Sequence, residues 1–227
     1  MKHLIILLLS LSIFATSCKK ENNNTNNSCN VDSVVDIDGN VYEVVSIGEQ
    51  CWLKENLRVT KFKNGDPISL ITGNSSWINS QIPAYCYYNN DLQNELKYGK
   101  LYNGLAVNDI RDIAPEGWRV PTETDWNKLF NFLGGYLIAG KAMKVSGDGN
   151  FGTPNTGTNS SGFTALPGGH RVGDSGGSNG GSFACGGTWA RYWGANSYSF
   201  YITDYQDYAY GGASSMTNGI AIRLIKE

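Results

Sequence analysis

The sequence contains little of what most metal and catalytic sites are made from. Histidine occurs only 2 times in 227 residues, and no Cys-x-x-Cys pair is present. Zinc sites are usually built from closely spaced cysteine and histidine ligands. The formal net charge is −2, and no basic run is interleaved with aromatic residues, although nucleic-acid-binding surfaces are normally basic. We therefore expect no metal, no cofactor and no nucleic-acid partner.

A hydrophobic run long enough to span a membrane is also missing. Residues 4–14 form an apolar stretch of about 11 residues, whereas a bilayer core needs roughly 20. Lys2 precedes this stretch, which is typical of a signal peptide and predicts one over residues 1–17. Ala15-Thr-Ser-Cys18 resembles a lipobox, so we expect cleavage before Cys18 and lipidation of its sulfur. The alternative is an ordinary secreted protein in which Cys18 is incidental.

The segment after Cys18 has no apolar side chain to bury. Residues 19–28 contain five asparagines, so residues 18–30 are predicted to form a disordered tether. Residues 31–227 follow as one domain, because no repeat or Pro/Ser-rich boundary divides them. Lys19 is not the aspartate that retains some bacterial lipoproteins in the inner membrane. We therefore expect an outer-membrane lipoprotein held by its lipid anchor and displayed at the cell surface, with a periplasmic orientation as the alternative.

Four further cysteines lie in the exported part of the chain, where disulfides can form. Cys29, Cys51, Cys86 and Cys185 allow three pairings. Cys51 and Cys86 both lie beside aromatic residues in the N-terminal half, so we favour a Cys51–Cys86 bridge. Closing a loop of about 35 residues would stabilise the fold by about 3–4 kcal/mol. Free thiols are the alternative for Cys29 and Cys185.

The first elements are predicted by a hairpin signal. Asp38-Gly-Asn40 separates two β-rich runs, residues 34–38 and 40–47, and Asp-Gly at such a place favours a tight turn. The stretch from Asp36 to Asn40 also superficially resembles a calcium loop. It lacks the length and the distal glutamate of such a loop, so we interpret it as a turn.

The strongest helix signal covers residues 122–133. Thr122 is a natural N-cap, and Asp125 three residues later gives a weaker form of the capping box. The apolar residues that follow fall on one face, at Trp126, Leu129, Phe130 and Leu133. Gly134-Gly135 ends the helix.

The C-terminal half predicts turns and strands. Of the 28 glycines, 19 lie from Gly140 onward, and glycine permits the backbone conformations of tight turns. We expect a short helix over residues 137–144 and then a meander with strands at residues 188–193, 198–203, 208–214 and 219–225. A few strands, one or two helices, long loops and a closing meander together indicate an α+β fold.

Four stretches resemble one known family. They are Ile47-Gly-Glu-Gln-Cys-Trp-Leu-Lys-Glu-Asn-Leu57, Gly99-Lys-Leu-Tyr-Asn103, Gly117-Trp-Arg-Val-Pro-Thr-Glu-Thr-Asp-Trp126 and Gly162-Phe-Thr-Ala-Leu-Pro-Gly-Gly-His-Arg171. Over residues 34–226 the chain resembles the Fibrobacter succinogenes major paralogous domain, found mostly in bacterial surface lipoproteins. The resemblance implies a C-type-lectin-like single domain with one main helix, long glycine-rich loops and a C-terminal antiparallel β meander. The family often ends in a Val-Arg-Cys strand, which is Ile222-Arg-Leu224 here.

The residues do not form a convincing catalytic set. Arg119–Trp126 is similar to a motif of the formylglycine-generating sulfatase-modifying enzymes, but those use two late cysteines and this late region has only Cys185. Cys–His catalysis would need His170 as its base, and that residue follows a Pro-Gly-Gly turn in a motif that looks structural. Calcium-dependent lectins usually carry Glu-Pro-Asn or Gln-Pro-Asp, and neither tripeptide occurs. We expect a protein that is not an enzyme.

Aromatic residues favour a binding function instead. The chain has 13 tyrosines and 6 tryptophans, and such rings stack on the apolar faces of sugars while carboxylates accept hydroxyl hydrogen bonds. The candidate ligand-binding residues are Trp193, Asp204, Tyr205, Asp207 and Tyr208. At least one of the two tyrosines should face solvent; the alternative is that the rings fill the core. We expect a binding or adhesion module for a polysaccharide or surface protein, with a structural coat protein as the alternative and an enzyme less favoured.

Overall fold

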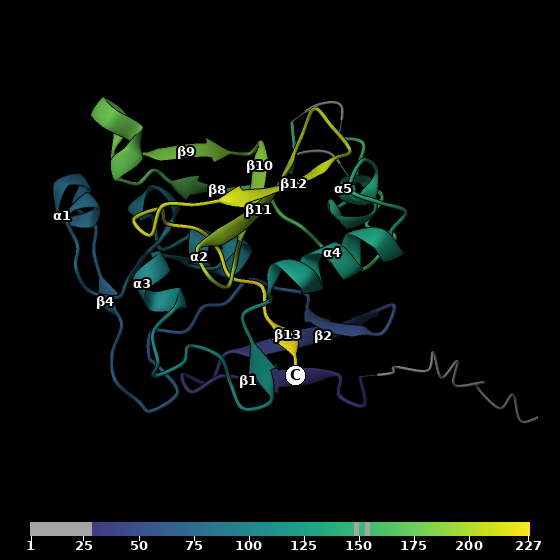
Figure 1. Cartoon of the computed structure of the whole chain (residues 1–227), viewed down its shortest axis with the longest axis horizontal. Helices are drawn as coiled ribbons and strands as arrows, with labels where there is room; N and C mark the ends of the chain where they lie inside the picture. Colours follow the sequence, from purple (N-terminus) through teal and green to yellow (C-terminus); the bar gives the residue numbers. More distant parts are fainter. Residues whose placement is uncertain (1–28, 148–149, 153–154) are drawn as a thin grey trace, which may run out of the picture.

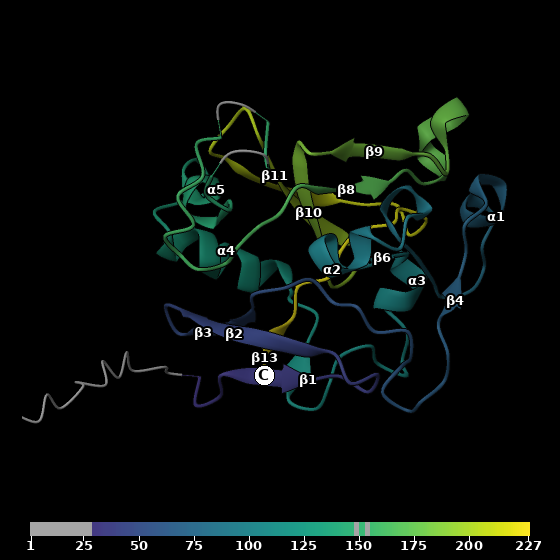
Figure 2. The same cartoon turned by 180° about the vertical axis from the view of Figure 1, so that it is seen from behind.

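The computed structural model describes residues 29–147, 150–152 and 155–227. The predicted signal peptide, Cys18 and nearly all of the tether lie outside the described residues. The described chain combines short helices with strands in several small sheets, which confirms the α+β class. Figures 1 and 2 show the N-terminal sheet at one end of the molecule, the C-terminal strands at the other, and helix α4 (Glu123–Phe132) between them.

The largest sheet joins the two ends of the domain. Its strands lie in the order β1 (Ser33–Val35), β2 (Val41–Ile47), β3 (Gln50–Leu53), β13 (Ile225–Lys226) and β7 (Trp118–Arg119). β1 and β2 are antiparallel, which confirms the predicted hairpin. The Asp36 carboxylate accepts hydrogen bonds from the N–H groups of Asp38 and Asn40, both at 2.9 Å, and from the Tyr42 hydroxyl at 2.6 Å. Asp36 therefore holds the turn in place.

The predicted main helix forms as α4. The Thr122 hydroxyl accepts a hydrogen bond from the Asp125 N–H at 3.3 Å, and the Asp125 carboxylate accepts one from the Thr122 N–H at 2.7 Å. This reciprocal pair is the capping box expected from the sequence. The buried Trp126 ring contacts Trp52 of β3, with centroids 4.9 Å apart, and Phe200 of the C-terminal sheet at 5.0 Å. α4 thus packs against both ends of the domain.

Three of the four predicted C-terminal strands form an antiparallel sheet. They are β10 (Trp189–Gly194), β11 (Tyr198–Thr203) and β12 (Ala209–Ala213). The fourth prediction, residues 219–225, is wrong for most of its length, because only Ile225 and Lys226 form a strand and that strand pairs with β3 and β7. Residues 218–225 are all buried, since the segment runs between two hydrophobic clusters. An alternating pattern predicts a strand with one buried and one exposed face. This segment is buried on all sides, so the pattern does not apply to it.

The remaining elements are short. They are β4 (Ser69–Leu70), α1 (Asn74–Ile78), β5 (Ala84–Cys86), the 3-10 helix η1 (Tyr88–Asn90), α2 (Asn94–Tyr98), β6 (Leu101–Tyr102), α3 (Gly104–Val107), α5 (Ala139–Met143), β8 (Gly168–Arg171), the 3-10 helix η2 (Asp174–Asn179) and β9 (Phe183–Gly186). α5 is the expected second helix, over a narrower range than residues 137–144. β4, β5 and β6 form one sheet, and β8 pairs with β9.

Two buried arginines connect the loops to the core. Arg223 donates from Nε and Nη2 to Asn56 Oδ1 at 3.0 and 2.7 Å. Arg171 donates from Nη1 and Nη2 to the carbonyls of Ile71 and Thr72, both at 2.6 Å. Because carbonyl oxygens surround each guanidinium, its N–H groups are satisfied in the core without a carboxylate.

The disulfide differs from the predicted one. Cys29 pairs with Cys51, with Cα atoms 5.6 Å apart, so the Cys51–Cys86 prediction is wrong. Cys86 is a fully buried free thiol in β5, and Cys185 is a half-buried free thiol. Lys226 of the last strand, β13, helps to position Cys29, because its Nζ donates a hydrogen bond to the Cys29 carbonyl at 2.8 Å. This contact joins the two ends of the domain, and no local sequence pattern reports it.

Candidate binding groove

The loop of residues 204–208 connects β11 to β12 and is held by one buried lysine. The Lys144 ammonium, which is fully buried, donates to the carbonyls of Thr203 and Gln206 at 3.3 and 2.9 Å and to Asp207 Oδ1 at 3.3 Å. A buried ammonium is stable only when its donors are satisfied. Lys144 therefore fixes the shape of the loop from inside.

The turn after α4 is also attached to this loop. Gly134 and Gly135 both adopt positive φ angles, 96° and 103°, and end the helix as predicted. The chain then returns so that the Tyr136 carbonyl accepts a hydrogen bond from the Ala209 N–H at 2.8 Å, and the Gly140 N–H donates to the Asp207 carbonyl at 2.9 Å. A Cβ atom at Gly140 would lie only 2.7 Å from that carbonyl oxygen, so this close approach requires glycine.

A groove of about 270 Å³ lies between α4 and strands β11 and β12. Its polar and amphipathic lining comes from Asn127, Tyr136, Tyr198 and Tyr210. A tyrosine offers an apolar ring and a hydroxyl in the same side chain, and an amide can both donate and accept hydrogen bonds. This combination suits a ligand that carries apolar faces and hydroxyl groups together.

A stack of three rings lies next to the groove on β10, β11 and β12. The rings of Trp189 and Tyr201 are 4.7 Å apart and nearly parallel, and Tyr210 continues the stack 5.2 Å from Tyr201. We call these three residues the aromatic ladder. Within the ladder the rings stack face to face, so a ligand can reach mainly the edges of the rings. The more open rings are Tyr136 and Tyr205, which are 60% and 69% exposed.

The predicted ligand-binding tyrosines lie at the edge of this region. Tyr205 is 69% exposed and Tyr208 36% exposed, which confirms that at least one of them faces solvent. The Tyr208 ring lies 5.7 Å from that of Tyr210 and so adjoins the groove. Asp204 and Asp207 are half-buried in the same loop. Asp207 is already engaged by Lys144.

The prediction for Trp193 is wrong. Its ring is fully buried, and its Nε1 donates to the Tyr102 carbonyl at 2.8 Å. Trp193 lies on β10, and its N–H donates to the Ala221 carbonyl at 2.9 Å, so the buried segment that leads into β13 runs beside it. The ring therefore fills the core and is inaccessible to a ligand.

Burial disfavours the charged forms of His170 and of the two free thiols. Burial, with a contribution from Arg191, lowers the pKa of His170 to about 4, and its ring packs against Trp189 with centroids 6.0 Å apart. Burial raises the pKa of Cys86 to about 12 and raises the pKa of Cys185 as well, which disfavours the reactive thiolate. In the part of the chain that the structure describes, no group of three or more side chains suits a metal ion.

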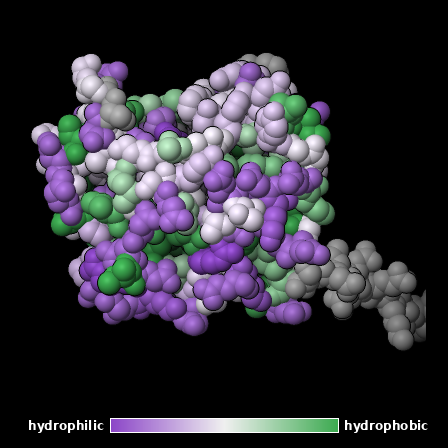
Figure 3. Space-filling view, in the orientation of Figure 1, coloured by the Kyte–Doolittle hydropathy of each residue, from purple (hydrophilic) through white to green (hydrophobic). Residues whose placement is uncertain are grey.

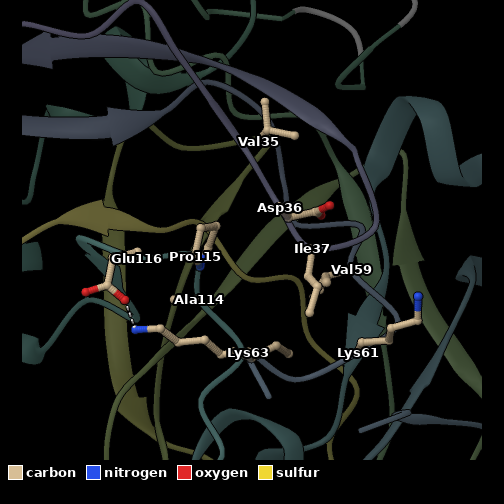
Figure 4. A pocket seen from close by; sticks show the side chains of 10 residues that line it. Val35, Asp36, Ile37, Val59, Lys61, Lys63, Ala114, Pro115 and Glu116 are labelled. Atoms are coloured by element: carbon tan, nitrogen blue, oxygen red, sulfur yellow. Dashed lines mark ion pairs between the residues drawn. The ribbon is translucent and has the colours of Figure 1, made fainter. Parts of the chain in front are cut away.

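A second hollow, of about 240 Å³, lies beside β1. Figure 4 shows Ile37 and Val59 close together in it and Lys63 paired with Glu116 on one side. Its lining is aliphatic and charged and includes no aromatic ring. It lacks the tyrosine rings and the amide that line the groove.

The family model described as the Fibrobacter succinogenes major domain matches residues 45–226. This range contains α4, the groove and the whole C-terminal sheet. The chain belongs to the Fibrobacter succinogenes major domain family. Neither the curated proteins nor the solved structures include a significant match. Within residues 29–147, 150–152 and 155–227, this Fibrobacter major domain has no helix that is long and apolar enough to cross a membrane.

Sequence reasoning missed Asn127, Tyr136 and Lys144 as parts of this region. Asn127 lies on the exposed face of α4, where polar residues are expected for solubility alone. Tyr136 follows two glycines in a turn, and Lys144 ends a short helical pattern. None of these positions carries a local signal, because the groove forms only when α4 and β12 come together.

Proposed function

We propose that this protein is a surface-anchored lipoprotein whose domain is a non-catalytic binding or adhesion module for glycans. The observation that carries the proposal is the groove between α4 and β12. Three tyrosines line it, at positions 136, 198 and 210, and two more stand exposed on the adjoining 204–208 loop. The lipid anchor at Cys18 and the outer-membrane, cell-surface location remain part of the proposal.

The chemistry of the groove fits a saccharide. A sugar presents C–H faces that pack on aromatic rings and hydroxyl groups that need hydrogen-bond partners. Tyr136 and Tyr205 supply exposed rings, and Asn127, which lines the groove, supplies an amide. Lys144 holds the loop before a ligand arrives, and such preorganisation reduces the entropy lost on binding.

A protein partner is the second candidate. Phe132, Leu137 and Ile138 are 63%, 48% and 54% exposed and lie on both sides of Tyr136 in the chain. Contiguous exposed apolar residues are typical of protein contacts. On the face shown in Figure 3, however, hydrophobic side chains form small separate groups among hydrophilic ones. This distribution favours the glycan over a large apolar partner.

The test uses the full-length chain on a glycan array, followed by affinity electrophoresis in the retained polysaccharide. The double variant Tyr205→Ala, Tyr208→Ala should weaken retention by about tenfold or more, because the ring contacts are lost. Leu96→Ala is the control, since Leu96 is 84% exposed on α2 and outside the groove. A clear fall in melting temperature with unchanged retention would contradict the proposal that the 204–208 loop binds the glycan.

We also propose that the α+β fold is of the C-type-lectin-like kind. The proposal is supported by the single long helix, the glycine-rich loops, the C-terminal antiparallel sheet and the pairing of the last strand with β3 near the start of the domain. A crystal structure that superimposes on a C-type-lectin-like domain with the same strand order would support it, and a different strand order would contradict it.

A further inference from the structure

Arg191 has unusually few hydrogen-bond partners for its degree of burial. It is half-buried on β10 and lies directly opposite Tyr201 of β11. Its Nε and Nη2 donate to the Ser199 hydroxyl at 3.3 and 3.1 Å, and Nη2 also donates to the Ser214 hydroxyl at 3.3 Å. These are long contacts to neutral groups, and a guanidinium has five N–H donors to satisfy.

Other arginines in the domain are better satisfied. Arg119 forms two hydrogen bonds with the Asp125 carboxylate, at 2.6 and 3.0 Å. Arg171 and Arg223 are fully buried, but carbonyl oxygens accept their N–H groups at short distances. Arg191 has neither arrangement, and it forms no ion pair with any carboxylate that the structure describes.

The titratable groups around Arg191 do not supply a negative charge. His170 of β8, Cys185 of β9 and Tyr201 of β11 are the ones that interact with it electrostatically. Burial keeps His170 neutral near pH 7, with a pKa of about 4, and raises the pKa of the Cys185 thiol. Asp204 interacts with Cys185, but it makes no ion pair with Arg191. The positive charge of Arg191 therefore has no negative counter-charge among the titratable groups of β8, β9 and β11 that surround it.

We propose that Arg191 binds the carboxylate of an acidic sugar residue in a polysaccharide that lies along the aromatic ladder. Withdrawing a cation from water without a counter-charge is unfavourable, and the planar guanidinium matches a carboxylate with two parallel hydrogen bonds. Arg191, Tyr201 and Tyr210 occupy one row across three strands. Since neighbouring strands are about 4.8 Å apart, the row spans about 10 Å from the backbone of Arg191 to that of Tyr210, which also lines the groove.

This inference rests on the proposed glycan function and narrows it to uronic-acid polymers. The probes are polygalacturonate and the same polymer with its carboxylates methyl-esterified, each cast in native gels with the full-length chain. We expect stronger retention by the acidic polymer, and the difference should shrink as the salt concentration rises, because the added contact is ionic. Arg191→Gln should weaken retention by the acidic polymer about tenfold or more and leave retention by the ester unchanged. Arg191→Lys should restore part of the loss.

The outcomes separate this inference from the proposed function. Equal retention by both polymers, insensitive to salt in the unmutated chain, would contradict the role of Arg191 while leaving glycan binding intact. Retention by the ester alone would do the same. Retention by neither polymer, together with no signal on the glycan array, would overturn the proposed function and this inference with it. The salt series uses the unmutated chain, so the test does not depend on whether the variants fold.

Discussion

At the residue scale, Asp125 makes several hydrogen bonds that hold the start of α4. Its carboxylate accepts hydrogen bonds from the Arg119 guanidinium, the Thr122 N–H and the Thr122 hydroxyl. Burial alone would raise the pKa of this carboxyl, but the hydrogen bonds from Arg119 and Thr122 outweigh burial and lower the pKa to about 2. The charged form is therefore the one that stabilises the fold.

This shift predicts a specific loss of stability in acid. The pKa of Asp125 is lower in the folded chain than its ordinary value of 3.8, so its contribution is complete above about pH 4 and is lost as pH falls through about 2. Asp125→Asn should lower the free energy of unfolding at pH 7 by about 1–2 kcal/mol, and should flatten its decline between those pH values. Denaturant melts at a series of pH values measure both effects. Glu123→Gln, an exposed change in the same first turn, is the control. If the stability of Asp125→Asn fell with acid as steeply as that of the unmutated chain, the prediction would be contradicted.

At the scale of the element, α4 depends more on the face it buries than on its cap. Trp126 is fully buried and contacts the rings of Trp52, Tyr192 and Phe200. Thr122 adds the capping box at one end. The packed face touches both ends of the domain, whereas the cap satisfies only the first turn.

Substitutions at the two places should therefore differ in size. Thr122→Ala should cost about 1 kcal/mol of unfolding free energy, and Trp126→Ala about 3–5 kcal/mol because it leaves a large cavity. Thr124→Ala is the matched control, since Thr124 is exposed in the same first turn. Urea melts of the three variants give the comparison. Small, equal effects from Thr122→Ala and Trp126→Ala would reject the packing described for α4.

At the scale of the whole molecule, the disulfide and the closing strand join the ends of the domain. The Cys29–Cys51 bridge closes a loop with a sequence separation of 22, and it should stabilise the fold by about 3 kcal/mol. Reductant should therefore lower the melting temperature of the unmutated chain. A variant with both Cys29→Ala and Cys51→Ala should lose that sensitivity, and Cys185→Ser should keep it. If Cys86→Ala abolished the effect of reductant, that result would contradict the Cys29–Cys51 bridge and support the Cys51–Cys86 pairing expected from the sequence.

The attachment to the membrane is a second prediction at this scale. Cys18 lies outside the described residues, and its lipidation remains a prediction from the sequence. Cys18→Ala should leave the chain without lipid and release it into the soluble fraction, because stable anchoring requires acyl chains. Cell fractionation and the intact mass of the mature chain measure this. A Cys18→Ala protein that still partitions with detergent-extracted membrane protein would show that the lipobox interpretation is incorrect.

The sequence by itself determined the elements whose signals are local. The hairpin at residues 38–40, the cap and apolar face of α4, and strands β10 to β12 depend on turn residues and periodicity, which neighbours in the chain carry. The exposure of Tyr205 followed from the polar residues beside it. Only the tertiary structure decided which cysteines pair, where residues 219–225 run, that Trp193 is buried, and that Arg191 lacks a counter-charge. Each of these depends on contacts between segments far apart in the chain, and such contacts leave no periodic trace in the sequence.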